Sequence, residues 1–204
     1  MLSRKNFLLI VSAPSGGGKT TLCQKLIKSL PAIKLSVSYT TRAPRNGEIN
    51  GRDYFFISSK RFLEMKSKGA FAEWALVHGN YYGTSADSIK KAIRSNIDLV
   101  LAIDTQGAAK VKKKFKDSVM VFVIPSSLKE LEKRLINRKA DSSEDIEKRM
   151  KAALKEIESI PQYDYLIIND DFSSALSDLK SIVIAERIKV LRNKEKKFSL
   201  KSLI

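Results

Sequence analysis

Residues 7–20 read FLLIVSAPSGGGKT, an apolar run that passes directly into a glycine-rich stretch ending in Lys19 and Thr20. The continuous apolar run at 7–12 predicts a buried strand of a parallel sheet, and residues 20–30 have the pattern of a helix. A glycine-rich loop between a strand and a helix is the setting of a phosphate-binding loop. This stretch therefore predicts an α/β fold with a nucleotide-phosphate site where the first strand ends.

The loop offers a separate group to each part of a nucleotide polyphosphate. Its glycines let backbone N–H groups wrap the phosphates, and the start of the following helix adds a positive dipole. Lys19 is predicted to reach the β- and γ-phosphate oxygens, and the Thr20 hydroxyl to ligate the Mg²⁺ bound with ATP. The usual pattern opens with glycine where this chain has Ala13, so the backbone there must accept a Cβ atom. The residues of the loop predicted to bind ATP are Ala13, Pro14, Ser15, Gly16, Gly17, Gly18, Lys19 and Thr20.

Apolar runs at 99–104, 119–124 and 165–169 predict further buried strands of the same sheet. Helical patterns fall between and after them, so the chain is predicted to form a P-loop NTPase-type parallel sheet with flanking helices. The predicted later helices are residues 127–137, residues 143 to just before Pro161, and a last one from about 173 through the basic tail.

Residues 35–85 interrupt this alternation and predict a small mixed-β insertion. The core would then comprise residues 1–34 and 86–204, with a helical lid at about 136–148. No internal repeat or flexible linker separates independent domains, so the parts are expected to share one core. The predicted elements of the insertion are short strands at 35–39, 53–57 and 71–77 and a helix at 60–68 stopped by Gly69.

Length and composition exclude several classes of protein. At 204 residues the chain can bury one sizeable core, and apolar runs such as 7–11 are far shorter than the roughly 20 residues that span a bilayer. One cysteine, Cys23, and one histidine, His78, leave too few ligands for a disulfide within the chain or a zinc site. We therefore expect a cytoplasmic protein with no membrane segment and no protein-bound transition metal.

The net charge of +16 invites the hypothesis of a nucleic-acid partner. The excess is spread along the chain, with +9 in residues 1–104 and +7 in residues 105–204. Lysine outnumbers arginine 27 to 11, as on a solvated, lysine-rich surface. We therefore do not expect nucleic acid as a partner. RNA contact by the basic tail remains the alternative, and it predicts an affinity that falls steeply with salt.

Four motifs occur in order between residues 36 and 84: SVSYTTRAPRNGE at 36–48, GRDYFF at 51–56, FAEW at 71–74 and GNYYGT at 79–84. Together they resemble the guanylate kinase family, whose members are P-loop nucleoside monophosphate kinases, and the resemblance covers residues 5–186. It implies ATP-dependent phosphorylation of GMP, and of dGMP, to the diphosphate with release of ADP, as part of purine nucleotide metabolism. Direct in-line transfer of the phosphoryl group is the implied mechanism.

The resemblance also implies how GMP is held. Guanine presents N1–H and N2–H₂ donors and an O6 acceptor, and the implied partners are the Glu73 carboxylate and the hydroxyls of Ser38 and Thr84, with Asp104 closing the base site. Adenine would match these groups badly, because its 6-amino group is a donor. The implied clamp on the acceptor phosphate consists of Arg42, Arg45, Tyr54 and Tyr82.

Residues 131–138, LEKRLINR, and 147–150, EKRM, resemble the family's lid, which carries arginines to the transferring phosphoryl group. Arg134 and Arg138 are spaced i, i+4 and share one face if the helix persists. Asn169 resembles the family's contact to the donor adenine. The implied catalytic residues are Lys19, Arg134, Arg138 and Arg149.

Two departures from the family pattern accompany these motifs. The family usually reads Asp-Ile-Asp where this chain has Ala102-Ile103-Asp104, so a carboxylate that could position Mg²⁺ or the phosphate clamp is missing. Lys139 follows Arg138 where the family commonly has glycine. Two alternatives stay open: a kinase for another nucleoside monophosphate, and a catalytically weak module that binds protein partners. ATP and GMP are the expected ligands, and the chain is expected to be a monomer or a homodimer.

Overall fold

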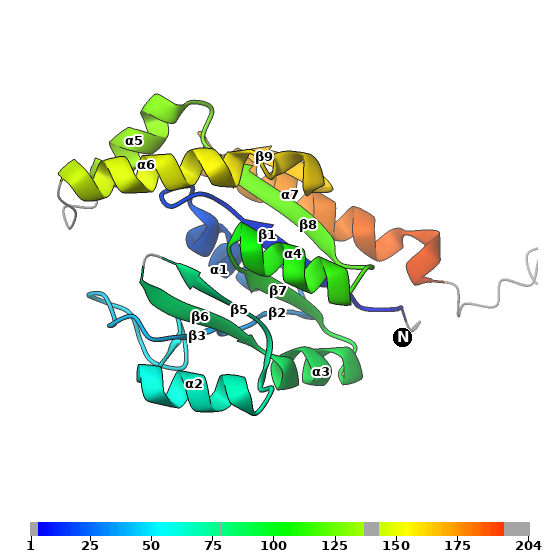
Figure 1. Cartoon of the computed structure of the whole chain (residues 1–204). Coiled ribbons are helices and arrows are strands. Elements are labelled where there is room, and N and C mark those ends of the chain that lie inside the picture. The colour runs from blue at the N-terminus through cyan, green and yellow to red at the C-terminus, as the bar shows by residue number, and fades with distance from the viewer. Residues whose placement is uncertain (1–3, 78, 137–142, 194–204) are drawn as a thin grey trace, which may run out of the picture.

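A parallel sheet of five strands forms the centre of the chain (Figure 1). The structure is a computed structural model and describes residues 4–77, 79–136 and 143–193. All neighbouring strands of the sheet are parallel, which confirms the prediction from the continuous apolar runs. In spatial order the strands are β2 (Ile33–Leu35), β7 (Asp98–Ala102), β1 (Leu8–Ser12), β8 (Val119–Ile124) and β9 (Tyr165–Ile168).

Alternate residues of the central strand β1 pack on opposite faces of the sheet, so each face has its own core. Leu9 and Val11 belong to a cluster that is closed by α1 (Lys19–Ser29) and α7 (Phe172–Ile188). Leu8 and Ile10 belong to a second cluster, which is covered by α3 (Ala86–Arg94) and α4 (Thr105–Lys114). Helices therefore lie on both faces of a buried parallel sheet, as the predicted α/β class requires (Figure 1).

A second, four-stranded sheet forms between residues 39 and 85. One of its pairs is parallel and the other two are antiparallel, so the predicted mixed-β insertion is confirmed. Phe62 of α2 (Ser59–Ser67) stacks on Phe71 with 4.5 Å between the ring centroids, and Gly69, with φ of 66°, ends the helix segment as predicted. In spatial order the strands are β4 (Phe55–Phe56), β3 (Tyr39–Thr40), β6 (Asn80–Ser85) and β5 (Phe71–Val77).

The prediction of one strand over residues 35–39 is wrong, because the chain crosses from one sheet to the other there. Leu35 ends β2 in the central sheet, and Ser36 still donates its backbone N–H to the Val100 carbonyl. Tyr39 begins β3, opposite Gly83 of the insertion. Both short strands bury some of their residues, so the sequence pattern does not show where the pairing partner changes. The elements α3, α4 and β6 were not predicted at all.

The last helix was predicted to run through the basic tail, but α7 ends at Ile188. Lys189 leaves the helical conformation, with φ −52° and ψ 132°, and the 3₁₀ turn η2 (Val190–Arg192) follows. The Arg192 guanidinium then pairs with the buried Glu186 carboxylate at 3.0 Å, and the backbone carbonyl of Arg192 accepts the N–H of Lys5. These contacts turn the chain back toward its own beginning, which a continued helix would prevent.

The helices α5 (Leu128–Ile136) and α6 (Ser143–Ile157) pack against each other at one end of the molecule (Figure 1). α5 begins where the capping pattern predicted, since Ser127 Oγ accepts the N–H of Glu130 at 3.1 Å. The 3₁₀ turn η1 (Ile160–Gln162) follows α6. Within the predicted lid at 136–148, residues 137–142, and with them Arg138 and Lys139, lie outside the described residues.

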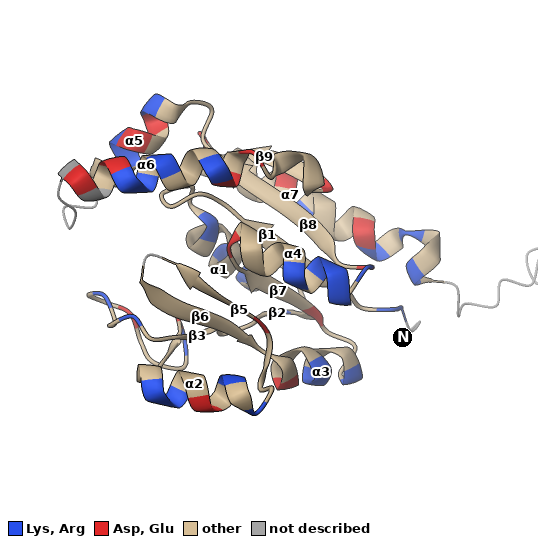
Figure 2. Cartoon of the chain, viewed as in Figure 1, with Lys and Arg blue, Asp and Glu red and all other residues tan. Residues whose placement is uncertain are grey.

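Basic side chains are distributed over several helices and are mixed with acidic ones, most visibly along α6 (Figure 2). The densest basic run on a described helix is the last turn of α4, with Lys112, Lys113 and Lys114. Among the described helices, none has both the length and the apolar character needed to cross a bilayer.

Candidate active site

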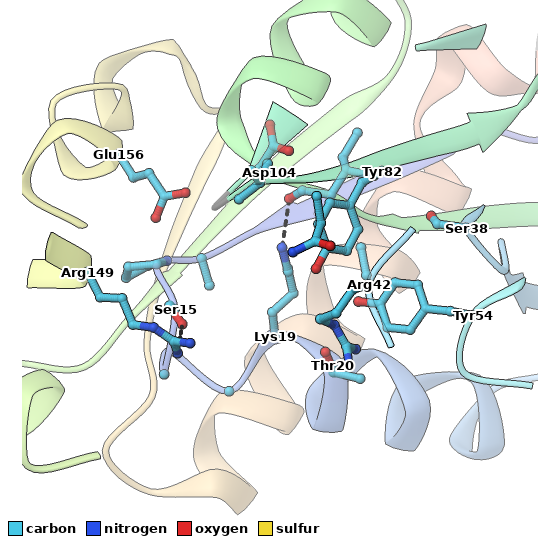
Figure 3. Close-up of a pocket in the computed structure, with 18 of the residues that line it drawn as sticks. Ser15, Lys19, Thr20, Ser38, Arg42, Tyr54, Tyr82, Asp104, Arg149 and Glu156 are labelled. Atoms are coloured by element: carbon cyan, nitrogen blue, oxygen red, sulfur yellow. Dashed lines mark hydrogen bonds between the residues drawn. The ribbon is translucent and has the colours of Figure 1, made fainter. Parts of the chain in front are cut away.

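A pocket opens where β1 and β7 end, between the central sheet, the insertion and α6 (Figure 3). Ligands of open α/β sheets bind at this edge, beyond the carboxyl ends of the strands. Most of the predicted site residues line this pocket together: Ala13, Pro14, Ser15, Gly16, Gly18, Lys19, Thr20, Ser38, Arg42, Arg45, Tyr54, Glu73, Tyr82, Asp104 and Arg149. The predicted residues outside its lining are Gly17, Thr84, Arg134 and Asn169.

The glycine-rich loop takes a conformation that needs its glycines. Gly16 and Gly18 have φ of 93° and 89°, in the left-handed region that favours glycine. Ala13 is not among the described residues with positive φ, so its Cβ causes no backbone strain. A Cβ on Gly17 would lie 2.9 Å from the Ala13 Cβ, so Gly17 makes room for the side chain of Ala13. The departure at Ala13 is therefore compatible with the loop.

Lys19 and Thr20 begin α1 and face the pocket (Figure 3). No side chain caps the start of α1 at Gly18, which leaves backbone N–H groups there for a ligand. The Lys19 ammonium donates to the backbone carbonyl of Ile103 at 2.9 Å, across the space between β1 and β7. Thr20 is exposed at the pocket surface. The loop thus presents a cation, a hydroxyl and a helix start to the same space.

Asn169 stabilises the phosphate loop through a hydrogen bond to its backbone. Its side chain is buried, and Nδ2 donates to the backbone carbonyl of Gly17 at 2.8 Å. A Cβ on Gly18 would lie 2.3 Å from the same nitrogen. The described contacts of Asn169 therefore hold the loop in place, and its contact with adenine remains a prediction.

Glu73 and Thr84 face each other on β5 and β6 at the insertion end of the pocket. The Thr84 hydroxyl donates to Glu73 Oε1 at 2.5 Å, so Thr84 acts on the pocket through Glu73. Burial raises the pKa of Glu73 to about 7, the hydrogen bond from Thr84 opposes this rise, and the nearby charge of Asp104 adds to it. Asp104 itself caps α4, accepting the N–H of Gly107 at 2.8 Å. A buried carboxylate and a second acid therefore close this end of the pocket.

Arg42 is held by Glu48, a residue to which the sequence motif assigned no role. Its guanidinium lies 2.8 Å from Glu48 Oε1, and the other carboxylate oxygen accepts the N–H of Arg45 at 2.7 Å. The burial of Glu48 would raise its pKa, but the hydrogen bonds from Arg42 and Arg45 lower it below the ordinary value. The Arg42 guanidinium also lies over the Tyr54 ring, 5.5 Å from its centroid, and Tyr54 contacts Tyr82 edge to face. The four predicted clamp residues therefore lie in the same part of the pocket.

Of the three predicted lid arginines, only Arg149 is described as part of the pocket. Its Nη1 lies 3.5 Å from Ser15 Oγ, at the phosphate loop (Figure 3). Arg134 instead pairs with Glu130 on its own helix at 2.9 Å and does not line the pocket. Arg138 lies outside the described residues.

Glu156 and Ala102 are among the pocket-lining residues that had no predicted role at this site. Glu156 of α6 is half-buried there, and burial raises its pKa to about 7, opposed by the charge of Lys19 and reinforced by that of Asp104. Ala102 presents its methyl group at the end of β7. The spacing of Glu156 seven residues after Arg149, two turns along the same helix face, is the signal that could have found it.

Residues 5–186 match the guanylate kinase family. The chain belongs to this family. A guanylate kinase of Geobacter metallireducens is 49% identical over 191 residues, which cover 94% of each chain. A guanylate kinase of Escherichia coli is 48% identical, covering 93% of this chain and 92% of its own. The crystal structure of guanylate kinase from Anaplasma phagocytophilum has a TM-score of 0.81 at 32% identity, covering 100% of this chain and 95% of its own.

Membership of the guanylate kinase family at this coverage makes the chain an enzyme, an ATP-dependent phosphotransferase that converts GMP to GDP. The two alternatives, a kinase for another nucleoside monophosphate and a module that only binds proteins, are not favoured. Assigning individual roles to the pocket residues requires the geometry described above.

Gly107→Ala is predicted to weaken GMP binding about tenfold while leaving ATP binding unchanged. A Cβ at this position would lie 2.7 Å from Glu73 Oε2, so the buried carboxylate would have to move away from its place opposite Thr84. Calorimetric titration with each nucleotide separately checks the effect. Gln106→Ala, at an exposed position of the same helix turn, is the control and should bind both nucleotides as the wild type does. Equal GMP affinity in the two variants would contradict the prediction.

Proposed function

We propose that this pocket binds ATP over the phosphate loop and GMP over the insertion, and that the γ-phosphoryl group passes directly between them. The observation that carries the proposal is that both predicted sets of residues line a single pocket. Lys19, Ser15 and Arg149 lie at one end, and Glu73, Ser38 and Arg42 come from the insertion. Two polyanions bound side by side in this way need only alignment and charge neutralisation to react.

In the proposed acceptor site, the Glu73 carboxylate receives the N1–H and N2–H₂ donors of guanine. Thr84 fixes the orientation of this carboxylate through its 2.5 Å hydrogen bond, and Ser38 offers a hydroxyl to O6. Adenine has an amino group in place of O6 and lacks both the N1–H and the N2 amino group, so the buried Glu73 carboxylate would keep only the donor of Thr84 and receive none from the base. Selectivity for GMP then follows from the cost of leaving a buried acid incompletely paired.

The proposed clamp on the GMP phosphate consists of Arg42, Arg45, Tyr54 and Tyr82. Because Glu48 already holds Arg42 and the backbone of Arg45, little side-chain freedom is lost when a phosphate arrives. A guanidinium fork matches phosphate oxygens with two parallel hydrogen bonds. The acceptor phosphate is thereby directed toward the phosphate loop.

In the proposed transfer step, Lys19 and Arg149 neutralise the charge that spreads over the phosphoryl oxygens. Lys19 would exchange its hydrogen bond with the Ile103 carbonyl for the β- and γ-phosphates. The acceptor oxygen is already ionised, so no general base is required. Water must be excluded to prevent hydrolysis of ATP, and we assign this task to closure of the insertion, residues 35–85, and of the lid over the core.

The residues present fit the Mg²⁺ that phosphate-loop kinases use with ATP. The described residues contain no cluster of three or more His, Cys, Asp or Glu side chains that could hold a metal alone. Mg²⁺ needs no such cluster, because it binds through substrate phosphates and one or two protein oxygens and keeps several waters. Thr20 supplies a hydroxyl in the same pocket. Bound with ATP, the ion would neutralise phosphate charge.

We propose no nucleic-acid partner, since the basic side chains are distributed over several helices (Figure 2). A cytoplasmic location is proposed with the function, because nucleotide substrates of this kind are used in the cytoplasm. A monomer or homodimer is proposed as the oligomeric state.

An acceptor panel tests the proposed function. ADP formation from ATP is measured with GMP, dGMP, AMP, UMP and dTMP, each at the same concentration. We expect turnover with GMP and dGMP and a rate at least about a thousandfold lower with the other three, since a pocket built to pair a base rejects mismatched bases strongly. Preferred turnover of AMP, UMP or dTMP would disprove the acceptor assignment. ATP and GMP binding without any turnover would support the weak module instead.

A further inference from the structure

Helix α6 presents two opposite charges to the phosphate end of the pocket. Arg149 reaches Ser15 of the loop, and Glu156, two turns further along the same face, lines the pocket beside Lys19 and Asp104 (Figure 3). The arginine has an evident partner in the phosphates of ATP. The carboxylate does not, because an acid facing a triphosphate repels it unless a cation lies between them.

In the same pocket as Glu156, the strand next to β1 ends without an acid. Ala102 is the last residue of β7, pairs with Val11 of β1 and lines the pocket close to where the phosphate loop begins. Phosphate-loop enzymes hold Mg²⁺ with the loop Ser or Thr and an acidic side chain of the core. Position 102 is where the family usually has such an acid, and a methyl group offers the ion no ligand.

The Glu156 carboxylate is available to take this place. No hydrogen bond or ion pair joins it to another described residue, while its neighbour Asp104 is engaged as the cap of α4. The carboxylate is half-buried on α6 and lines the pocket, so a charge there favours a cation beside it. A divalent cation arriving with ATP would supply that positive charge.

We propose that Glu156 supplies, from α6, the carboxylate of the Mg²⁺–ATP site that position 102 lacks. It would accept hydrogen bonds from water molecules on the ion, while Thr20 would offer its hydroxyl from the loop. The inference rests on the proposed function, because it requires ATP at the phosphate loop. It assigns to Glu156 a positioning role, since the carboxylate acts on the phosphates through the hydrated ion.

Calorimetric titration of ATP without GMP, so that no transfer occurs, tests this role. The affinity for ATP is measured with Mg²⁺ and with EDTA, and the ratio of the two gives the contribution of the ion. Glu156→Gln should lower this ratio about tenfold, as is typical when a group that orients a metal's ligands is removed. Its affinity for ATP in EDTA should be equal to or tighter than that of the wild type, because a negative charge facing the triphosphate is gone. If Glu156 had only a structural role, Glu156→Gln would weaken ATP binding equally with Mg²⁺ and with EDTA.

Two further variants make the result specific. Glu158→Gln changes an exposed acid just beyond the end of α6 and should keep the wild-type ratio. Adding Ala102→Asp to Glu156→Gln should restore the ratio, because a carboxylate is then present at position 102, where the family usually has one. The inference is wrong if Mg²⁺ strengthens ATP binding equally in the wild type and Glu156→Gln, if neither protein responds to Mg²⁺, or if Ala102→Asp restores nothing. In each of these cases, GMP-dependent ADP formation by the wild type shows separately whether the proposed function holds.

Discussion

Lys19→Ala lowers GMP-dependent ADP formation by at least about a thousandfold, which is the largest single effect we expect. Lys19 begins α1 after the left-handed Gly16 and Gly18, and its ammonium donates to the Ile103 carbonyl just after β7. Its removal leaves the transferring phosphoryl charge without the ammonium group of the loop, and the backbone N–H groups there carry no full charge. Steady-state rates at saturating ATP and GMP measure the loss, which should appear mainly in kcat.

Two measurements show that this loss comes from the chemistry. Lys25→Ala, at an exposed position of the same helix, should keep wild-type activity. Thermal unfolding of Lys19→Ala should resemble that of the wild type, because the lost hydrogen bond to Ile103 is partly exposed. If Lys19→Ala retained a tenth or more of the wild-type rate, the loop would not be the site of transfer.

Glu73→Gln lowers kcat/KM for GMP by about a hundredfold or more, the second large effect. The amide keeps the shape of the side chain but turns one acceptor into an N–H₂ donor, which then opposes the guanine donors inside a buried site. Calorimetry should show ATP affinity unchanged, because Glu73 lies at the insertion end of the pocket. Glu64→Gln, on the outer helix of the insertion, is the matched control and should leave kcat/KM unaltered. Equal kcat/KM for GMP in wild type and Glu73→Gln would exclude Glu73 from base recognition.

The same carboxyl makes guanosine binding depend on pH. Burial raises the pKa of Glu73 to about 7, so in the empty pocket the group is protonated below that pH and ionised above it. Guanosine, which lacks a titrating phosphate, should therefore bind more tightly as the pH rises from 6 to 8, and Glu73→Gln should not show this rise.

The contribution of the Glu73 carboxyl to folding stability falls as the pH rises, whereas guanosine binding is expected to tighten. A carboxyl whose pKa is higher in the folded chain favours folding fully below its ordinary value near 4.5, and this contribution is lost as the pH rises through about 7. The melting temperature of Glu73→Gln relative to wild type should therefore increase between pH 5 and pH 8. A constant difference would contradict the raised pKa.

The core of the fold followed from local patterns. Four continuous apolar runs marked four of the five parallel strands, because a strand covered on both faces by helices has no need of alternating polar residues. The strand β2, three residues long, was merged with the insertion, since its place beside β7 depends on hydrogen bonds with a segment more than 60 residues away. The helix α7 ends before the tail, where Arg192 pairs with Glu186. The helix propensities of the residues in the tail do not predict this ion pair.

Much of the candidate site could also be predicted from the sequence, but the acids that lie beside its basic residues could not. Lys19, Arg42 and Glu73 were found because a loop or motif of fixed order marks them. Glu48 and Glu156 were missed as site residues, since isolated acids on a turn or a helix resemble ordinary surface residues until the fold places them beside Arg42 and Lys19.

The sequence by itself determined the phosphate loop, the parallel sheet and the resemblance to GMP kinases, because these depend on contacts within short segments and on the order of motifs. Only the tertiary structure decided that Ala13 is compatible with the loop through Gly17, that Thr84 acts on the pocket through Glu73, and that Glu156 and Ala102 line the same pocket. The physical reason is that burial, hydrogen-bond partners and charge are set by groups far apart in the chain.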